Sequence, residues 1–149
     1  MNEGEWFPPK WMYRDQRPDD EGYFENLTRV IFQAGLNWKV IDNKWSDFKR
    51  AFRSFDIDKV AKFGSKEIER LMIDTGIVRN KAKIIATIEN SKQFQKIRKE
   101  FGSFQGWLDT LDKSDNYALI VKELQKTFSR IGPSTAQIFL YSVGEDIKH

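Results

Sequence analysis

The chain of 149 residues contains no cysteine, and its single histidine is the last residue, His149. Without cysteine the protein can form no disulfide, no thiolate nucleophile and no thiolate site for zinc. One histidine at the end of the sequence also argues against a Ser-His-Asp site and against a multi-histidine metal site. The composition therefore predicts no bound metal, and we expect no cofactor.

Long apolar runs are also absent. No stretch approaches the roughly 20 residues that cross a bilayer, and residues 1–5 do not resemble a signal peptide. We therefore expect a cytoplasmic monomer without a membrane partner. The protein is only mildly basic, because 25 Lys and Arg residues against 22 Asp and Glu residues give a net charge of +3. A surface for nucleic acid would thus require local clustering of cations.

Proline is rare outside residues 1–22, which hold three of the four prolines and show no helical period. We interpret residues 1–22 as an extended arm packed on the domain, and residues 23–149 as a single helical domain. A clear example of the helical period is Ile41, Trp45, Phe48 and Phe52, at spacings of four, three and four. No segment shows sustained alternation of apolar and polar residues, so the predicted fold class is all-α.

The most informative short segment is 128–136, within a predicted helix-hairpin-helix at about 117–143. A helix ends, a turn contains Gly132, and a second helix begins with small hydroxyl residues. Glycine permits a positive φ and a close backbone approach, and the start of a helix attracts anions. We therefore expect a DNA phosphate here, bound by Arg130, Ile131, Gly132, Ser134 and Thr135. The alternative is an ordinary corner with Ser134 or Thr135 as a plain cap.

A second cationic segment, residues 75–83, leads from a glycine turn into a helix. Its three cations, Arg79 and Lys81 among them, are candidates for further phosphate contacts. A solvated helix face without a ligand is an equally good interpretation.

Taken together, these segments resemble the 3-methyladenine DNA glycosylase I family, a branch of the helix-hairpin-helix glycosylases. The resemblance covers residues 23–144 and is most specific in five stretches that follow one another in order: QAGLNW at 33–38, FKRAF at 48–52, FDIDKVA at 55–61, IERL at 68–71 and GIVRNKAKI at 76–84. It implies seven to eight helices in two lobes around a base-binding groove. It also implies double-stranded DNA with an alkylated base as the partner, from which such enzymes flip a methylated adenine and hydrolyse its glycosidic bond.

The resemblance assigns base contacts to two aromatic residues. Trp38 corresponds to the aromatic wall of the base pocket, and Tyr13 corresponds to a second stacking surface in the arm. Both fit the chemistry, because a cationic methylated adenine over an aromatic face gains roughly 0.5–2 kcal/mol. The alternative for Trp38 is a core tryptophan.

The chain departs from the family at the metal site. The family holds structural zinc with two cysteines and two histidines, whereas the first two matching positions here are Gly4 and Arg14. The second histidine corresponds to His149, and the sequence stops before the last cysteine. The resemblance thus implies a zinc-free member.

A second departure affects the chemistry. The family's base-recognising glutamate, eight residues before the pocket tryptophan, corresponds to Val30, which can neither accept a hydrogen bond nor attract a cation. Asp42 and Asp15 are the candidates for a catalytic carboxylate in its place, and their alternative is a solvated or capping role. No lysine stands at the family's lyase position, where Ser134 lies nearby, so we expect no lyase step.

Three functions follow in order of preference. The first is a monofunctional hydrolytic glycosylase for alkylated purines such as 3-methyladenine. The second is a non-catalytic protein that binds damaged or distorted DNA. The third is a helical protein-interaction domain.

Overall fold

The computed structural model describes residues 17–148, which form eight α-helices, one short 3-10 helix and no strand. The predicted all-α class is confirmed. In chain order the elements are α2 (Asp20–Gln33), α3 (Trp38–Ala51), η2 (Arg53–Phe55), α4 (Ile57–Ala61), α5 (Ser65–Met72), α6 (Lys81–Phe101), α7 (Phe104–Asp109), α8 (Ser114–Thr127) and α9 (Pro133–Ser142).

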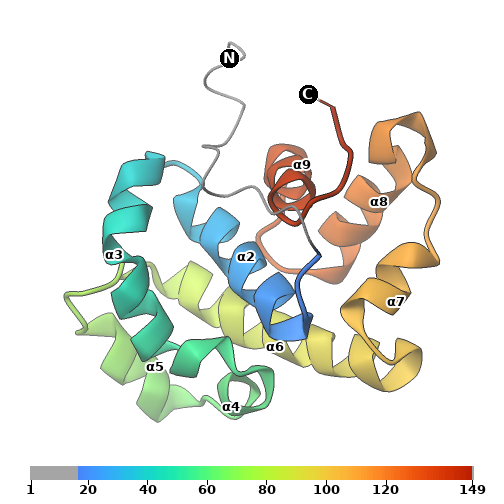
Figure 1. The fold of residues 1–149 in the computed structure, drawn as a ribbon. Helices are drawn as coiled ribbons and strands as arrows, with labels where there is room; N and C mark the ends of the chain where they lie inside the picture. Colours follow the sequence, from blue (N-terminus) through green and yellow to red (C-terminus); the bar gives the residue numbers. More distant parts are fainter. Residues whose placement is uncertain (1–16, 149) are drawn as a thin grey trace.

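Two helices run through the middle of the fold and divide it into two lobes. Figure 1 shows α2 and α6 between one group formed by α3, α4 and α5 and another formed by α7, α8 and α9. Helix α2 packs against α3, α7 and α9, while α6 packs against α4, α5 and α7. The two central helices therefore contact both lobes, in agreement with the two-lobed fold expected from the sequence.

Aromatic side chains fill the interior of both lobes. In the first lobe the rings of Trp45 and Phe55 stack with centroids 5.3 Å apart, and in the second Tyr23 packs on Phe104 at 4.4 Å. Phe24 of α2 contacts Phe94 of α6 at 5.5 Å and joins the two sets. Such ring pairs stabilise a core beyond their buried area, so the lobes share one continuous core.

Side-chain caps explain where the helices begin. Asp19 accepts a hydrogen bond from the Gly22 amide at 2.8 Å, and Asn37, Asp56 and Asn80 cap α3, α4 and α6 in the same way. Because of the Asp19 cap, α2 begins at Asp20. The predicted end of the arm at residue 22 is therefore three residues too late, because the cap starts the helix before its apolar period begins at Tyr23.

An ion-pair network joins the beginning and the end of the described chain. The Arg17 guanidinium donates two hydrogen bonds to Asp109, at 3.0 and 2.8 Å. Glu145, only 6% exposed, lies 2.9 Å from Lys113 Nζ and 3.3 Å from Arg17 Nε. The Tyr117 hydroxyl donates a further hydrogen bond to Glu145. The network thus fixes residue 17 to α7, α8 and the C-terminal segment.

Candidate functional site

The predicted hairpin is present between α8 and α9, but its backbone differs from the expectation in one respect. The residue with a positive φ is Arg130, at 64°, whereas Gly132 has φ −94° and ψ 177°. The expectation that Gly132 supplies the left-handed turn is therefore wrong, because the chain reverses two residues earlier.

The turn before Arg130 is held by the buried side chain of Asn90 in α6. Asn90 Oδ1 accepts from the Ser129 amide at 2.8 Å, and Asn90 Nδ2 donates to the Ser129 carbonyl at 3.3 Å. The Ser129 hydroxyl also donates to Glu89 at 2.8 Å. Helix α6 therefore sets the position of the hairpin.

Gly132 leaves open space at the start of α9. A Cβ at this position would have no atom within 4 Å among the described residues, and no side chain caps the helix. Pro133 has no N–H, so the first amides of the helix are those of Ser134, which is exposed, and Thr135, which is half-buried. Uncapped amides at the positive end of a ten-residue helix can bind an anion that approaches over Gly132.

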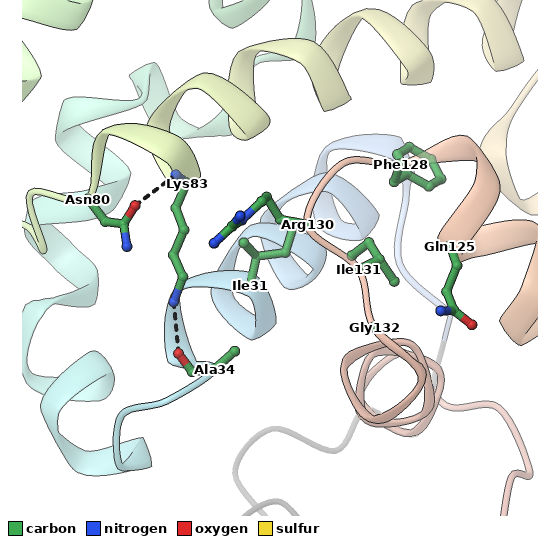
Figure 2. Close-up of a pocket in the computed structure, with 9 residues that line it drawn as sticks. All are labelled: Ile31, Ala34, Asn80, Lys83, Gln125, Phe128, Arg130, Ile131 and Gly132. Carbon is green, nitrogen blue, oxygen red and sulfur yellow. Dashed lines mark hydrogen bonds between the residues drawn. The ribbon is translucent and has the colours of Figure 1, made fainter.

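A cavity of about 590 Å³ lies between the C-terminal end of α2, the N-terminal end of α6 and the hairpin. Figure 2 shows its lining: Ile31, Ala34, Asn80, Lys83, Gln125, Phe128, Arg130, Ile131 and Gly132. Apolar side chains make part of the wall, while two cations and two amides supply the polar groups. None of these lining residues is acidic.

Lys83 ties α6 to the end of α2. Its ammonium donates to the Ala34 carbonyl at 2.8 Å and to the Phe32 carbonyl at 3.3 Å. These carbonyls lie at the end of a helix, where cations are favourable. Burial lowers the pKa of Lys83, and the positive charge of Arg130 lowers that pKa further.

The two predicted base contacts of the described chain do not line this cavity. Trp38 is the first residue of α3, half-buried and packed against the core. Val30 is completely buried in the core, with 0% exposure, and Ile31 and Ala34 form the α2 wall of the cavity instead. The structure thus contradicts a direct base contact by Val30 in this packing, because no part of its side chain is accessible.

The other predicted site residues divide into three groups. Asp42 is exposed, one helical turn after Trp38, and lies outside the cavity lining. Arg79 and Lys81 are exposed at the N-terminal end of α6, next to the cavity. The two remaining candidates, Tyr13 and Asp15, lie outside the described residues.

Three polar residues that line the cavity are Asn80, Lys83 and Gln125. The sequence analysis assigned no role to Asn80 or Gln125, and it included Lys83 only as one of the cations of residues 75–83. A signal for two of them was present, because Asn80 and Lys83 both lie within the family-like stretch 76–84 and are three residues apart at the start of a helix. Gln125 had no signal, since α8 reaches this cavity only through the tertiary fold.

The described residues do not fit a metal site. Residues 17–148 contain no group of three or more His, Cys, Asp or Glu side chains that could hold a metal ion. Gly4, Arg14 and His149, the positions that correspond to the family's zinc ligands, lie outside this part of the chain, so a zinc-free protein remains a prediction. None of the described helices combines the length and the apolar character needed to cross a lipid bilayer.

An all-helical protein with two lobes and an open helix-hairpin-helix has the architecture of a DNA glycosylase, and comparison with known proteins specifies the family. The sequence model of the family described as methyladenine glycosylase matches residues 4–138. The chain belongs to this family.

Two relatives are named as DNA-3-methyladenine glycosylases. The protein from Haemophilus influenzae is 27% identical over 158 residues, which cover 94% of this chain and 82% of the relative. DNA-3-methyladenine glycosylase 1 of Escherichia coli is 32% identical over 93 residues, covering 62% of this chain and 46% of the relative.

Solved structures agree with this assignment. 3-Methyladenine DNA glycosylase I from Staphylococcus aureus superposes with a TM-score of 0.77 at 27% identity, covering 87% of this chain and 79% of that one. A variant of a 3-methyladenine DNA glycosylase I in complex with 3-methyladenine gives 0.78 at 26% identity, covering 89% of this chain and 81% of that one. The family resemblance and the glycosylase fold expected from the sequence are confirmed.

Proposed function

We propose that this protein is a monofunctional base-excision glycosylase that binds duplex DNA and hydrolyses the N-glycosidic bond of alkylated purines such as 3-methyladenine. The observation that carries the proposal is the uncapped, open start of α9 beside a cation-lined cavity, in a chain that belongs to the methyladenine glycosylase family. We further propose that it acts as a monomer in the cytoplasm.

The hairpin supplies the sequence-independent part of DNA binding. A phosphate over Gly132 would accept from the amides of Ser134 and Thr135, while Arg130 adds charge from the turn. Arg79 and Lys81 extend the same cationic edge along the start of α6. Such backbone contacts fix the register of the protein on DNA and carry no sequence information.

Trp38 and Tyr13 are the proposed surfaces for the flipped base. Flipping costs a few kcal/mol of lost pairing and stacking, and an aromatic face recovers part of this from a cationic base.

The chemistry needs little from the protein beyond orientation. Water forms a bond to the sugar C1′ as the bond from C1′ to the base breaks, and the base carries the bonding electrons away. Because an alkylated base is cationic, its departure neutralises it and makes it a good leaving group. The proton lost by water passes to solvent or to a carboxylate, for which Asp42 and Asp15 are the candidates.

Mass spectrometry of bases released from methylated duplex DNA tests the proposal directly. The parent protein should release 3-methyladenine, and Trp38→Ala should reduce the rate by more than tenfold while salt-dependent binding to undamaged duplex stays within about twofold. Tyr13→Phe is the matched control for the second ring, because it keeps the stacking surface and removes only the hydroxyl. Tight binding of alkylated duplex without release of any base would refute the proposal.

A second candidate is a non-catalytic protein that binds damaged DNA with the same surface. It is favoured by the buried apolar side chain at Val30 and by the absence of an acidic residue from the lining of the described cavity. For this function, Trp38→Ala should abolish the preference for lesion-containing over intact duplex, and no condition should release a free base.

A further inference from the structure

Two cations approach each other across the cavity from separate parts of the chain. Lys83 reaches it from the N-terminal end of α6 and Arg130 from the hairpin, as Figure 2 shows. Like charges in one partly buried space repel each other. Among the described residues no carboxylate lines the cavity to offset them, so an anion between them would relieve the repulsion.

Both cations have donors left for a ligand. An ammonium group has three N–H donors, and the Ala34 and Phe32 carbonyls occupy two of those of Lys83. Arg130 is exposed and makes no hydrogen bond or ion pair within residues 17–148. Its guanidinium presents a planar set of donors that suits phosphate oxygens.

The rest of the lining suits the sugar-phosphate backbone. Ala34, which is exposed, and the edge of Ile131 give the cavity a small apolar surface for a deoxyribose, and Asn80 and Gln125 add amide groups. A volume of about 590 Å³ has room for a phosphate with its adjoining sugar. Gly132 lies at the border of this cavity and also begins α9, so one strand can pass from the cavity to the start of that helix.

We infer that this cavity binds a second phosphate of the DNA strand, next to the phosphate at the start of α9, and that Lys83 and Arg130 are its ligands. This inference rests on the proposed function, because it requires DNA to bind at the hairpin. Since Lys83 also holds the end of α2, the bound phosphate would connect the turn that leads to Trp38 with the hairpin. The cavity therefore contributes to lesion binding without touching the base.

The test is a scan of duplexes that contain a stable abasic analogue and one uncharged methylphosphonate at successive positions of the lesion strand. The parent protein, Lys83→Gln and Arg130→Gln are titrated with each duplex at several salt concentrations. On the all-phosphate duplex each substitution should weaken binding about tenfold and reduce the salt slope by about one. One duplex in the scan should bind the parent protein about tenfold more weakly than the all-phosphate duplex does, because its methylphosphonate replaces the phosphate in the cavity. On that duplex, Lys83→Gln and Arg130→Gln should bind no more weakly than the parent.

Three controls separate this role from a loss of folding. Lys83→Arg should retain most of the affinity, because it keeps the charge next to the Ala34 carbonyl. Arg130→Gln leaves the contacts of Lys83 with α2 intact. Lys99→Gln removes an exposed cation from the last turn of the same helix and should leave affinity unchanged, and thermal unfolding should detect any folding defect.

The possible outcomes are distinct. Unchanged affinity and salt slope in both Gln variants would overturn the inference while the proposed function stands. A tenfold loss that no methylphosphonate position suppresses would also overturn it, since the cations would then act on no particular phosphate. If the parent protein binds no duplex, the proposed function fails and the inference fails with it.

Discussion

Replacing Glu145 with alanine should destabilise the protein markedly, although the residue lies near the end of the chain. Its carboxylate is 6% exposed and contacts Lys113 at 2.9 Å and Arg17 at 3.3 Å. The Tyr117 hydroxyl donates to the same carboxylate at 3.2 Å. The substitution therefore removes the carboxylate that pairs with two cations and accepts a hydrogen bond from a phenol.

The expected loss of stability depends on which ion-pair partners Arg17 and Lys113 keep after the substitution. Removing one partner of a fully buried ion pair costs about 3–5 kcal/mol. Here Arg17 and Lys113 both keep Asp109, and their side chains are 26% and 36% exposed. We therefore expect a loss of about 2–3 kcal/mol, which lowers the unfolding temperature by roughly 5–10 °C in a chain of this size.

Thermal unfolding followed by circular dichroism is the appropriate assay. Glu145→Gln should lose less, because its amide still accepts hydrogen bonds while the charge is gone. Asp146→Asn is the matched control, since Asp146 is adjacent but 85% exposed in its pair with Lys148, and exposed pairs contribute little. An alanine variant that unfolds within about 1 °C of the parent, as an exposed pair would, would refute the conclusion that the network stabilises the fold.

Three further predictions concern the site and its support. Gly132→Ala should leave the unfolding temperature unchanged, because φ is −94° and the new methyl group meets open space. The same methyl group should weaken duplex binding about tenfold by obstructing the phosphate. Equal affinities of the variant and the parent in a filter-binding titration would contradict this. Val30→Glu should destabilise the protein by about 2–4 kcal/mol in denaturant unfolding, because a larger polar group enters a packed core, and parent-like stability would instead reveal an opening beside α2. Hydrogen bonds from Arg17 lower the pKa of Asp109 in the folded protein, so the unfolded chain binds more protons and the contribution of this pair to stability is lost as pH falls below about 4. Asp109→Asn should make the free energy of unfolding depend less on pH in this range. An unchanged pH dependence would exclude the ion pair as its cause.

Local regularities account for the parts of the fold that the sequence predicted. The spacing of Ile41, Trp45 and Phe48 marks the buried face of α3, and all three are buried. Asp56 directly precedes α4 and caps it, with its side chain accepting from the Lys59 amide. These features depend on residues three or four apart, and such short-range geometry is readable in a single sequence.

The hairpin was predictable in place but not in detail. The turn between α8 and α9 falls where Gly132 and Pro133 interrupt the apolar period. The left-handed residue is nevertheless Arg130, since Asn90, 39 residues away, holds Ser129 through two hydrogen bonds and decides where the chain reverses. Turn chemistry alone would assign that conformation to glycine.

The sequence by itself determined the helical class, the position of the hairpin and the family to which the chain belongs, because each depends on a local pattern or on ordered motifs. Only the tertiary structure decided that Val30 is sealed in the core, that Glu145 joins Arg17 to Lys113, and that Lys83 meets Arg130 across a cavity. Lys83 holds the Ala34 carbonyl across 49 residues of sequence. Contacts at such separations depend on how whole helices pack, and neither the period nor the capping pattern of a single helix encodes that packing.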